Sequence, residues 1–458
     1  MSRSLDDTPQ IEQMQQATLE SDLWNTEVVP RLPRELASQA CSLKAFVRVR
    51  EVKSASDLLR ALLAYVLCAP SFQRVGAWAV LIGLAELSDS AWSKRLLKAS
   101  AWLLWLLGEL LAVPAPASWL HDRARSRVLL VDATRLRQPG GCGDDWRVHS
   151  GYDLLAGRLS EVTVTDQHTG ESLAHFHLQP TDIVVADNGY GYRSNVAIVV
   201  KQQADAVLRI TPSTFPLEDR QGREVDVLRW LHSKGKSVRS KVCWCRWKGK
   251  RYRVRLIARH LPPEVAEAAR QRKIQRAKDK GKEVTEEMLF LAGWVLLITT
   301  LPQQEWSDAQ VLQLYRARWQ AELVYKRMKQ LLRLNQIRST TAAGAQATVR
   351  ALLVVWALQE EEASQVREQL GQAQAELEAQ TQTEFPAVSS WVLTGLCLET
   401  LRLQVQGQWS AARLHACVPR LRRFLCSHRC RRVHQETAMR AWLASPTRRL
   451  PTALQRTG

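Results

Sequence analysis

The sequence lacks an apolar run long enough to cross a lipid bilayer. Its most apolar segment, residues 99–112, contains Gly108 and Glu109 and is followed by Pro114, so we expect a buried helix there and no membrane anchor. The N-terminal stretch MSRSLDDTPQIEQMQQ is polar and carries acids, and it lacks the basic start and apolar centre of a signal peptide. We therefore expect a cytoplasmic protein.

The sequence also lacks paired cysteine motifs. The nine cysteines are an odd number with no CxxC pair, which indicates free thiols in a reducing compartment and not a disulfide framework. One cluster, Cys426, Cys430 and His434, recurs at steps of four with Cys417 upstream, and such a helix face can bind zinc. Because the intervening residues are mostly arginine, buried or incidental thiols are the other interpretation, and metal binding there stays open.

Acidic residues are too few to balance the basic ones. The chain has 64 Lys and Arg against 45 Asp and Glu, a formal net charge of +19. Such an excess points to a polyanionic partner, with nucleic acid the commonest and a membrane surface the next. The 458 residues, 46% of them apolar, are sufficient for about two to four domains with a large core, so a globular protein is expected and a disordered one is excluded.

Apolar periodicity divides the chain into regions. Residues 1–120 have helical periodicity and almost no strand signal. In residues 121–200, the runs VLLVDATRL, WRVHSGYDL and LSEVTVTD predict an antiparallel meander, and DIVVADNGYGY predicts a further strand. Residues 201–299 are mainly strands interrupted by one charged helix, which indicates an insertion.

The last regions are helical. Residues 300–345 contain an unbroken helical period that begins with N-cap chemistry at Ser307 and Asp308. Residues 346–458 contain a narrow apolar seam, which indicates a helix-on-helix contact within the chain or between chains. The seam is formed by Val366, Leu370, Ala373 and Leu377. An arginine-rich segment at 419–434 is either a phosphate-binding face or a solvated helix surface.

One stretch of the long helix carries the most informative pattern. In YRARWQAELVYKRMK, the residues Tyr315, Arg318, Glu322 and Lys329 are spaced by three, four and seven, so a helix places them on one stripe about 21 Å long at roughly 1.5 Å per residue. Such a row can follow several phosphates while it holds one carboxylate at a reacting centre. An ordinary amphipathic helix with a salt bridge is the plainer interpretation.

Two aspartates upstream have the pattern of metal ligands. Asp132 lies within one buried strand and Asp187 ends another, and a buried aspartate is costly unless it has a partner or a metal. Asp144, Asp145 and Asp182 are rivals, but their positions are typical of turns and caps. Because magnesium prefers oxygen ligands, and paired cations need rigidly held carboxylates, these two aspartates with Glu322 are our candidate site.

These residues resemble a known family, the DDE transposases of insertion-sequence family four. Asp132 in VDAT, Asp187 in ADNGYG and the helix signature resemble that family's three catalytic blocks, in order and with the expected spacing, over roughly residues 75 to 340. One departure is Asn188, where the family often has arginine, and it puts a neighbouring phosphate contact in doubt.

The resemblance implies an architecture. The expected fold class is α/β, with a ribonuclease-H-like core (a mixed sheet flanked by helices) at 121–200 and 300–345 and a β-rich insertion at 201–299. The helical region 1–120 would bind DNA ends, and the helical region 346–458 would dimerise and add basic DNA contacts.

The resemblance also implies a mechanism. Asp132, Asp187 and Glu322 would bind two Mg²⁺ ions, for which Mn²⁺ can substitute, water would attack at the element's end, and the freed 3′-hydroxyl would attack DNA. In relatives the released end passes through a hairpin, and a tryptophan of the insertion stacks on a flipped base. Trp294 occupies that position here, although a core tryptophan is the alternative.

Three further residues would contact DNA. The resemblance assigns Tyr315, Arg318 and Lys329 to phosphates beside the scissile bond. The expected function is therefore cut-and-paste transposition by a bacterial, nucleoid-associated protein that pairs terminal inverted repeats as a homodimer and inserts them into target DNA. The alternatives are a catalytically idle DNA-binding regulator derived from a transposase, and a ribonuclease-H-like nuclease without strand transfer.

Overall fold

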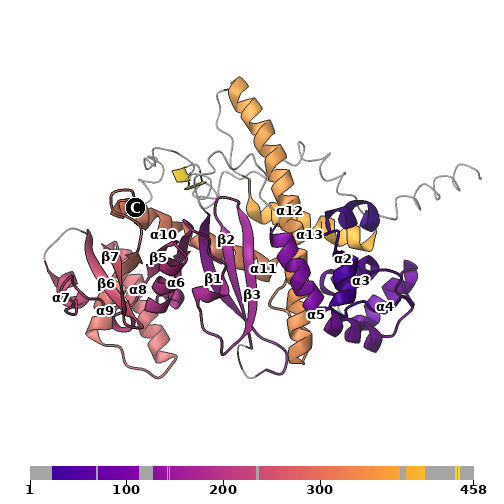
Figure 1. Cartoon of the computed structure of the whole chain (residues 1–458), viewed down its shortest axis with the longest axis horizontal. Coiled ribbons are helices and arrows are strands. Elements are labelled where there is room, and N and C mark those ends of the chain that lie inside the picture. Colours follow the sequence, from indigo (N-terminus) through magenta and orange to yellow (C-terminus); the bar gives the residue numbers. More distant parts are fainter. Residues whose placement is uncertain are drawn as a thin grey trace, which may run out of the picture.

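The structure is a computed structural model that describes residues 23–68, 71–112, 127–141, 143, 145–233, 237–381, 388–407, 439–440 and 442–443, without the side chains of 373–381. The described elements form an elongated molecule (Figure 1). N-terminal helices lie at one end, a sheet forms the middle, and the strands and helices of the insertion form the other end.

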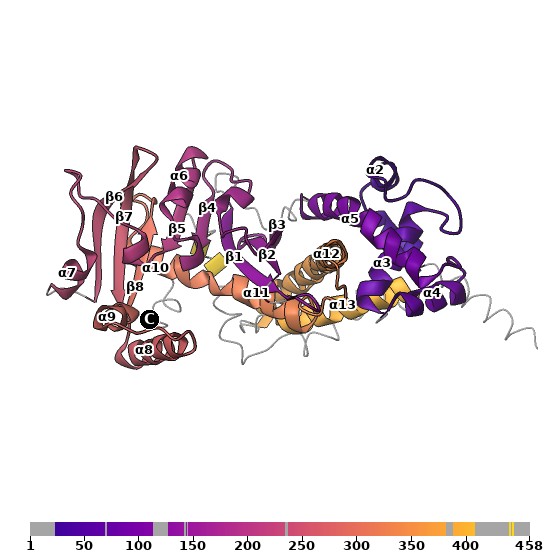
Figure 2. The same ribbon diagram turned by 90° about the horizontal axis from the view of Figure 1, so that it is seen from below.

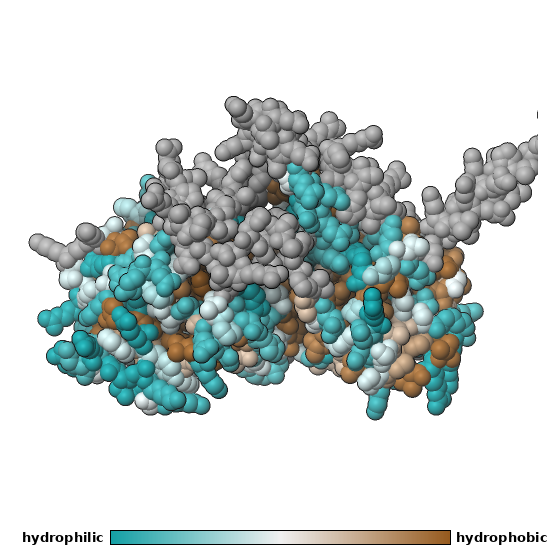
Figure 3. Space-filling view, turned by 45° about the horizontal axis from the view of Figure 1, so that its top comes forward, coloured by the Kyte–Doolittle hydropathy of each residue, from teal (hydrophilic) through white to brown (hydrophobic). Residues whose placement is uncertain are grey.

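The N-terminal region is helical, as its periodicity predicts. A short π-helix (Trp24–Val28) and a 3₁₀ helix (Val29–Arg31) precede α2 (Leu36–Ser42), α3 (Ala55–Leu67), α4 (Phe72–Leu81) and α5 (Asp89–Ala112). Serine caps start α3 and α4, because Ser54 and Ser71 accept hydrogen bonds from backbone N–H groups of the first turn. Figure 3 shows some apolar side chains at the surface of this end, and Val80 and Leu81 are among those exposed.

One sheet of eight described strands, in the order β3-β2-β1-β4-β5-β8-β7-β6, extends from the middle of the molecule to the insertion end (Figure 1). The predicted meander is confirmed as antiparallel β1 (Val128–Leu136), β2 (Trp146–Asp153) and β3 (Arg158–Asp166). Then β4 (Ile183–Ala186) and β5 (Asp205–Arg209) lie parallel to β1. A short connection through α6 (Arg193–Lys201) makes the parallel pairing of β4 and β5 possible.

The strands of the insertion extend this same sheet. Antiparallel β8 (Trp294–Thr299) pairs with β5, and β7 (Lys250–His260) and β6 (Val238–Trp247) follow outward. Although β5 belongs to the segment 201–299, it is the last parallel strand of the central sheet. In chain order, the first strand of the extension is therefore β6. Three helices accompany these strands, namely α7 (Val227–His232), α8 (Pro263–Lys278) and α9 (Glu286–Ala292).

The sheet lies between two helical layers, which Figure 2 shows edge-on. Alternation along the strands separates the layers, because successive side chains point to opposite faces. On β1, Val131 packs in the core on the α6 side, whereas Leu130 packs in the core that contains α10 (Asp308–Ala317) and α11 (Trp319–Gln330). This mixed α/β arrangement confirms the predicted fold class.

The helix that carries the signature is not continuous, so the prediction of one unbroken helix was wrong. It starts as predicted with a capping box between Ser307 and Gln310, but it divides into α10 and α11 at Arg318. At the break, the N–H groups of Arg318 and Ala321 bond to carbonyls three residues earlier and not four. Because Arg318 itself keeps helical dihedral angles, the break is a local tightening.

The C-terminal helices pack on the rest of the chain. The long helix α12 (Ala342–Thr381) contacts α5, α3 and α13 (Ser390–Gln406). Val366 and Leu370 of the predicted seam are buried with Leu393 and Cys397 of α13, so this part of the seam is a contact within the chain.

Two predicted features lie outside the described residues. They are the cluster of Cys417, Cys426, Cys430 and His434 and the arginine-rich segment 419–434. Among the described residues, no helix is both long and apolar enough to cross a membrane.

Candidate active site

The sheet register brings the two predicted aspartates side by side. In the parallel pairing of β1 with β4, Val131 lies opposite Ala186, and the next residues in this register are Asp132 and Asp187. Neighbouring strands lie about 4.8 Å apart. By alternation, both aspartates belong to the face that α10 and α11 cover, since Leu130 and Val185 pack there.

A tyrosine fixes α11 above these aspartates. The Tyr325 hydroxyl donates to the carbonyl oxygens of Val148 (2.7 Å) and Asp132 (3.1 Å), and the ring is buried. Glu322 lies one turn before Tyr325 on the same face of the helix. At the other end of the stripe, Lys329 Nζ donates to the carbonyl of Arg135 at 3.4 Å, so the helix follows β1 outward.

The charges of the three acids act on one another. Burial raises the pKa of Asp132 to about 7, the negative charges of Asp187 and Glu322 add to the rise, and the N–H of Ala133 and the charge of Arg318 oppose it. Burial lowers the pKa of Arg318, but Tyr315, Glu322 and Asp132 outweigh that effect and raise it.

The donor set fits a hard divalent cation, but the side chains are not yet gathered around one. All three candidates offer carboxylate oxygens, the ligands that magnesium prefers. Glu322, however, accepts a hydrogen bond from Arg318 Nη2, and one oxygen of Asp187 accepts from the N–H of Gly189 at 2.8 Å. Within the described part of the chain, no three Asp, Glu, His or Cys side chains lie close enough to hold one ion together. Glu322 would have to leave Arg318 before it could bind a cation with the aspartates.

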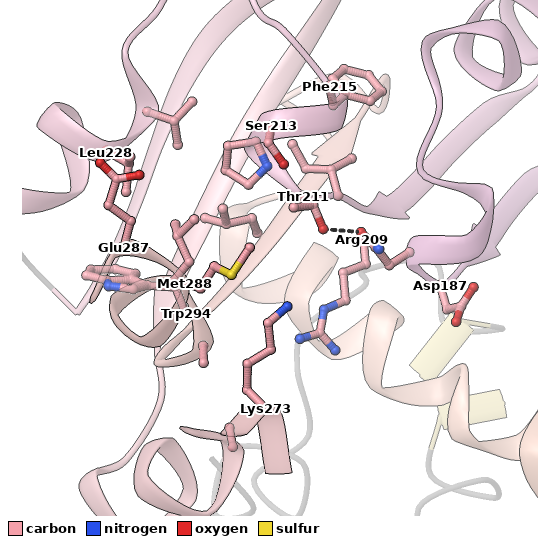
Figure 4. Close-up of a pocket in the computed structure, with 18 of the residues that line it drawn as sticks. Asp187, Arg209, Thr211, Ser213, Phe215, Leu228, Lys273, Glu287, Met288 and Trp294 are labelled. Carbon is pink, nitrogen blue, oxygen red and sulfur yellow. Dashed lines mark hydrogen bonds between the residues drawn. The ribbon is translucent and has the colours of Figure 1, made fainter. Parts of the chain in front are cut away.

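The site opens into a large cleft of about 1450 Å³. Asp187, Arg318 and Glu322 line one side of it, and residues of the insertion line the other. Figure 4 shows Arg209 at the end of β5 and Lys273 of α8 with their side chains pointing into this space. Asp132 does not line the cleft, whereas the other two acids do.

Comparisons with known proteins agree with this arrangement. A family model described as the transposase DDE domain matches residues 123–358. The transposase for insertion sequence element IS421 of Escherichia coli is 35% identical over 333 residues, which cover 70% of this chain and 88% of the relative. The InsL protein of insertion sequence element IS186A of Escherichia coli K12, a putative transposase, is 36% identical over 329 residues, with the same coverage.

The chain belongs to the DDE transposase family. The match includes all three candidate acids and their supporting strands and helices, so the predicted family is confirmed. Membership implies that the transposase binds DNA.

The structure does not present Trp294 of the transposase as an open stacking surface. The side chain is 6% exposed, and its ring lies against His260 at 4.8 Å, Phe290 at 6.2 Å and the guanidinium of Arg239 at 5.0 Å. Trp294 is one of the residues that line the cleft, but these neighbours cover most of its ring. This burial favours the alternative interpretation, a tryptophan of the core.

Three residues of the transposase site escaped the sequence-based prediction. Trp319, directly after Arg318, lines the cleft and is 42% exposed. Arg209 lines the cleft beside Asn188, the position that lacks the family's arginine. Burial raises the pKa of Glu171, and the negative charge of Asp187 adds to the rise. Only Trp319 left a signal in the sequence, because it directly follows Arg318 of the signature. Tertiary packing brings Arg209 and Glu171 to the site, so their positions in the sequence give no sign of it.

The glycines after Asp187 permit close approach, as their position predicts. A Cβ on Gly189 would clash with a carboxylate oxygen of Glu171, and one on Gly191 would clash with the carbonyl oxygen of Arg209.

Two rival acids have structural partners, in line with their turn and cap positions. Asp182 is buried and paired with Arg127 at 2.7 Å, and Asp145 accepts a hydrogen bond from the N–H of Gln138. Both carboxylates are therefore explained without a metal.

Tyr315 of the signature and Asn188, directly after Asp187, occupy different environments. Tyr315 lies under Arg318, whose guanidinium carbon is 5.8 Å from the ring centroid, and burial raises the pKa of this phenol. Asn188 accepts a hydrogen bond from the hydroxyl of Thr211 at 2.9 Å, the dashed line in Figure 4. Arg318 is therefore the cation of the signature closest to the acids, and Tyr315 supports it from below.

Proposed function

We propose that this transposase cuts DNA at the ends of its element and joins the freed ends to target DNA, with Asp132, Asp187 and Glu322 as the metal-binding catalytic residues. The observation that supports the proposal is that three carboxylates, from β1, β4 and α11, lie on one face of the sheet beside a cleft with cations on its walls, although no three acids of the described residues are close enough to share one ion. Besides burial, the charges of Asp187 and Glu322 raise the pKa of Asp132, and a bound cation would relieve that repulsion.

Magnesium would be held by Asp132, Asp187 and Glu322, and manganese could replace it. When bound, such cations supply positive charge that offsets the charge developing on the phosphate oxygens. Asp132 must lose its proton to act as a ligand, so loading the site releases a proton near neutral pH.

The cationic residues of the signature would orient the phosphates. Once Glu322 turns toward the aspartates, the guanidinium of Arg318 can fork to two phosphate oxygens. Lys329, about two turns beyond Glu322 along the stripe, would act as a point charge on the next phosphates. The N-terminal helices would recognise the terminal inverted repeats, and a homodimer would pair the two ends.

The test is an assay with a labelled duplex that carries one element end and its flanking DNA. With Mg²⁺ we expect a nick at the end, then a hairpin, and a joined product when a target plasmid is added; with EDTA we expect binding alone. Cleavage without joining would indicate a nuclease lacking strand transfer. Binding without cleavage in Mg²⁺ or Mn²⁺ would indicate a regulator and would overturn the catalytic assignment.

Two tryptophans separate a stacking role from a core role. Trp294→Ala should destabilise the protein by about 3–5 kcal/mol, because it removes a buried aromatic ring. Trp319→Ala should change the free energy of unfolding by less than about 1 kcal/mol and should impair hairpin formation while the first nick survives, since an exposed ring beside the acids can stack on an unpaired base. Thermal unfolding and a gel that resolves nick from hairpin measure both effects. A stable Trp294→Ala protein that nicks but forms no hairpin would restore the stacking role to Trp294.

A further inference from the structure

Helix α8 (Pro263–Lys278) is poorly explained by packing. Of its sixteen residues only Ala266 is buried, and its main neighbour is the short helix α9. A surface helix usually keeps a broad apolar stripe against the core, and one that is polar nearly all round contributes little to burial. Packing against the core therefore does not account for α8, which indicates that the helix has another role.

One face of α8 is directed at the cleft. The residues of α8 that line the cleft are spaced by three, one and three, which is a single helical face. They are Ala269, Arg272, Lys273 and Arg276. Figure 4 shows Lys273 reaching from this helix into the space that Asp187 borders from the opposite side. We call Arg272, Lys273 and Arg276 the α8 cationic face.

The α8 cationic face forms no ion pair with an acid of the described residues. Among the ion pairs of the described residues none involves these three side chains, and the one pair within α8 joins Arg270 to Glu267. The helix does carry Glu264 in its first turn and cations in its last, a distribution that stabilises any helix through its dipole. That effect explains the choice of charge near the C-terminus but not the direction in which the three cations point.

We propose that the α8 cationic face binds backbone phosphates of the DNA strand that lies in the cleft across from Asp187 and Glu322. This proposal rests on the proposed function, because it names what that site holds on its second wall. A polyanion beside three carboxylates is repelled, and cations on the facing wall would offset part of that repulsion in addition to any metal ions held by the acids. Arg272 and Arg276 are about 6 Å apart along the axis, at 1.5 Å per residue, so the face presents charge along the strand as well as across it.

The experiment compares two triple variants of the full-length protein. The cleft variant is Arg272→Gln, Lys273→Gln and Arg276→Gln. The control is Lys278→Gln, Lys280→Gln and Lys282→Gln, which removes the same charge from exposed positions that do not line the cleft. Glutamine has nearly the helix propensity of the residues it replaces, so α8 should persist in both.

Binding is measured in EDTA as a function of salt, so that no cleavage is needed. On DNA that spans the element end and its flank, the cleft variant should bind roughly tenfold more weakly, and the slope of log affinity against log salt should fall by about 2.7, or about 0.9 for each phosphate contact. The control should change the slope by less than about 0.9, the value that corresponds to one phosphate contact. On DNA that stops before the cleavage point, the two variants should bind alike.

The outcomes separate the two proposals. Equal losses in both variants, or no loss in either, would overturn the role of the α8 cationic face and would leave the catalytic proposal intact. A selective loss in the cleft variant, with a wild-type protein that binds but never cleaves in Mg²⁺, would support the face and overturn catalysis. Circular dichroism of both variants checks that a selective loss does not come from unfolding.

Discussion

Asp132→Asn should eliminate DNA cleavage and at the same time stabilise the metal-free protein. In the proposed function the carboxylate would help to hold catalytic cations, whose charge would lower the barrier by several kcal/mol, so a loss of about 10³-fold or more in cleavage rate is expected. End-labelled DNA in Mg²⁺ measures this rate. Cleavage within tenfold of wild type would remove Asp132 from the site.

The gain in stability follows from the raised pKa of Asp132. Its pKa rises from the ordinary aspartate value of 3.8 to about 7 in the fold, so the folded state favours the protonated form. The stability this proton contributes is complete below pH 3.8 and is lost as the pH rises through 7, by at most about 4 kcal/mol at 1.36 kcal/mol per pKa unit. Asparagine carries no charge at any of these pH values and escapes the loss.

Thermal unfolding in EDTA at pH 5 and pH 8 measures this difference. The wild-type melting temperature should fall more between the two pH values than that of Asp132→Asn. Added Mg²⁺ should raise the wild-type melting temperature at pH 8 and should raise that of the variant much less, because a cation replaces the lost proton. A variant less stable than wild type at pH 8 in EDTA would contradict the destabilisation that the raised pKa of Asp132 predicts for the wild-type protein.

Glu322→Gln should also reduce cleavage by about 10³-fold, since it removes the carboxylate that α11 brings to the aspartates. Its binding to DNA in EDTA should be equal to wild type or tighter, because Arg318 loses its ionic partner and is available to phosphate. Binding titrations and cleavage rates on the same duplex separate these two effects.

The matched control is Glu287→Gln, the same chemical change in the same cleft. Glu287 lines the insertion side of the cleft and is exposed, and Figure 4 shows it away from Asp187. Its replacement should leave cleavage within about twofold of wild type. Similar losses in both variants would mean that the cleft requires negative charge in general, and Glu322 would no longer have a special role.

Sequence patterns predicted the strands that carry the site because those strands are buried on both faces. VLLVDATRL corresponds to β1 from its first residue to its last, and IVVA corresponds to β4. Continuous apolar runs of this length are typical of central strands. An aspartate within or directly after such a run is costly without a partner, which is why Asp132 and Asp187 could be selected among 45 acids.

Patterns that depend on one helix or one side chain were less informative. A period of 3.6 residues continues through Arg318 even though the hydrogen-bond pattern changes there, so periodicity could not reveal the break between α10 and α11. Trp294 begins a buried strand, and only the packing of His260, Phe290 and Arg239 around it showed that its ring is enclosed.

The sequence by itself determined the family, the α/β class and the three candidate acids, because these depend on local periodicity and on residue types at fixed spacing. Only the tertiary structure decided which charges share the cleft, since Arg209 of β5 and the α8 cationic face come from a strand and a helix far apart along the chain. Their positions are set by the pairing of β5 with β8 and by the packing of α8 on α9. Neither contact leaves a periodic signal in the sequence.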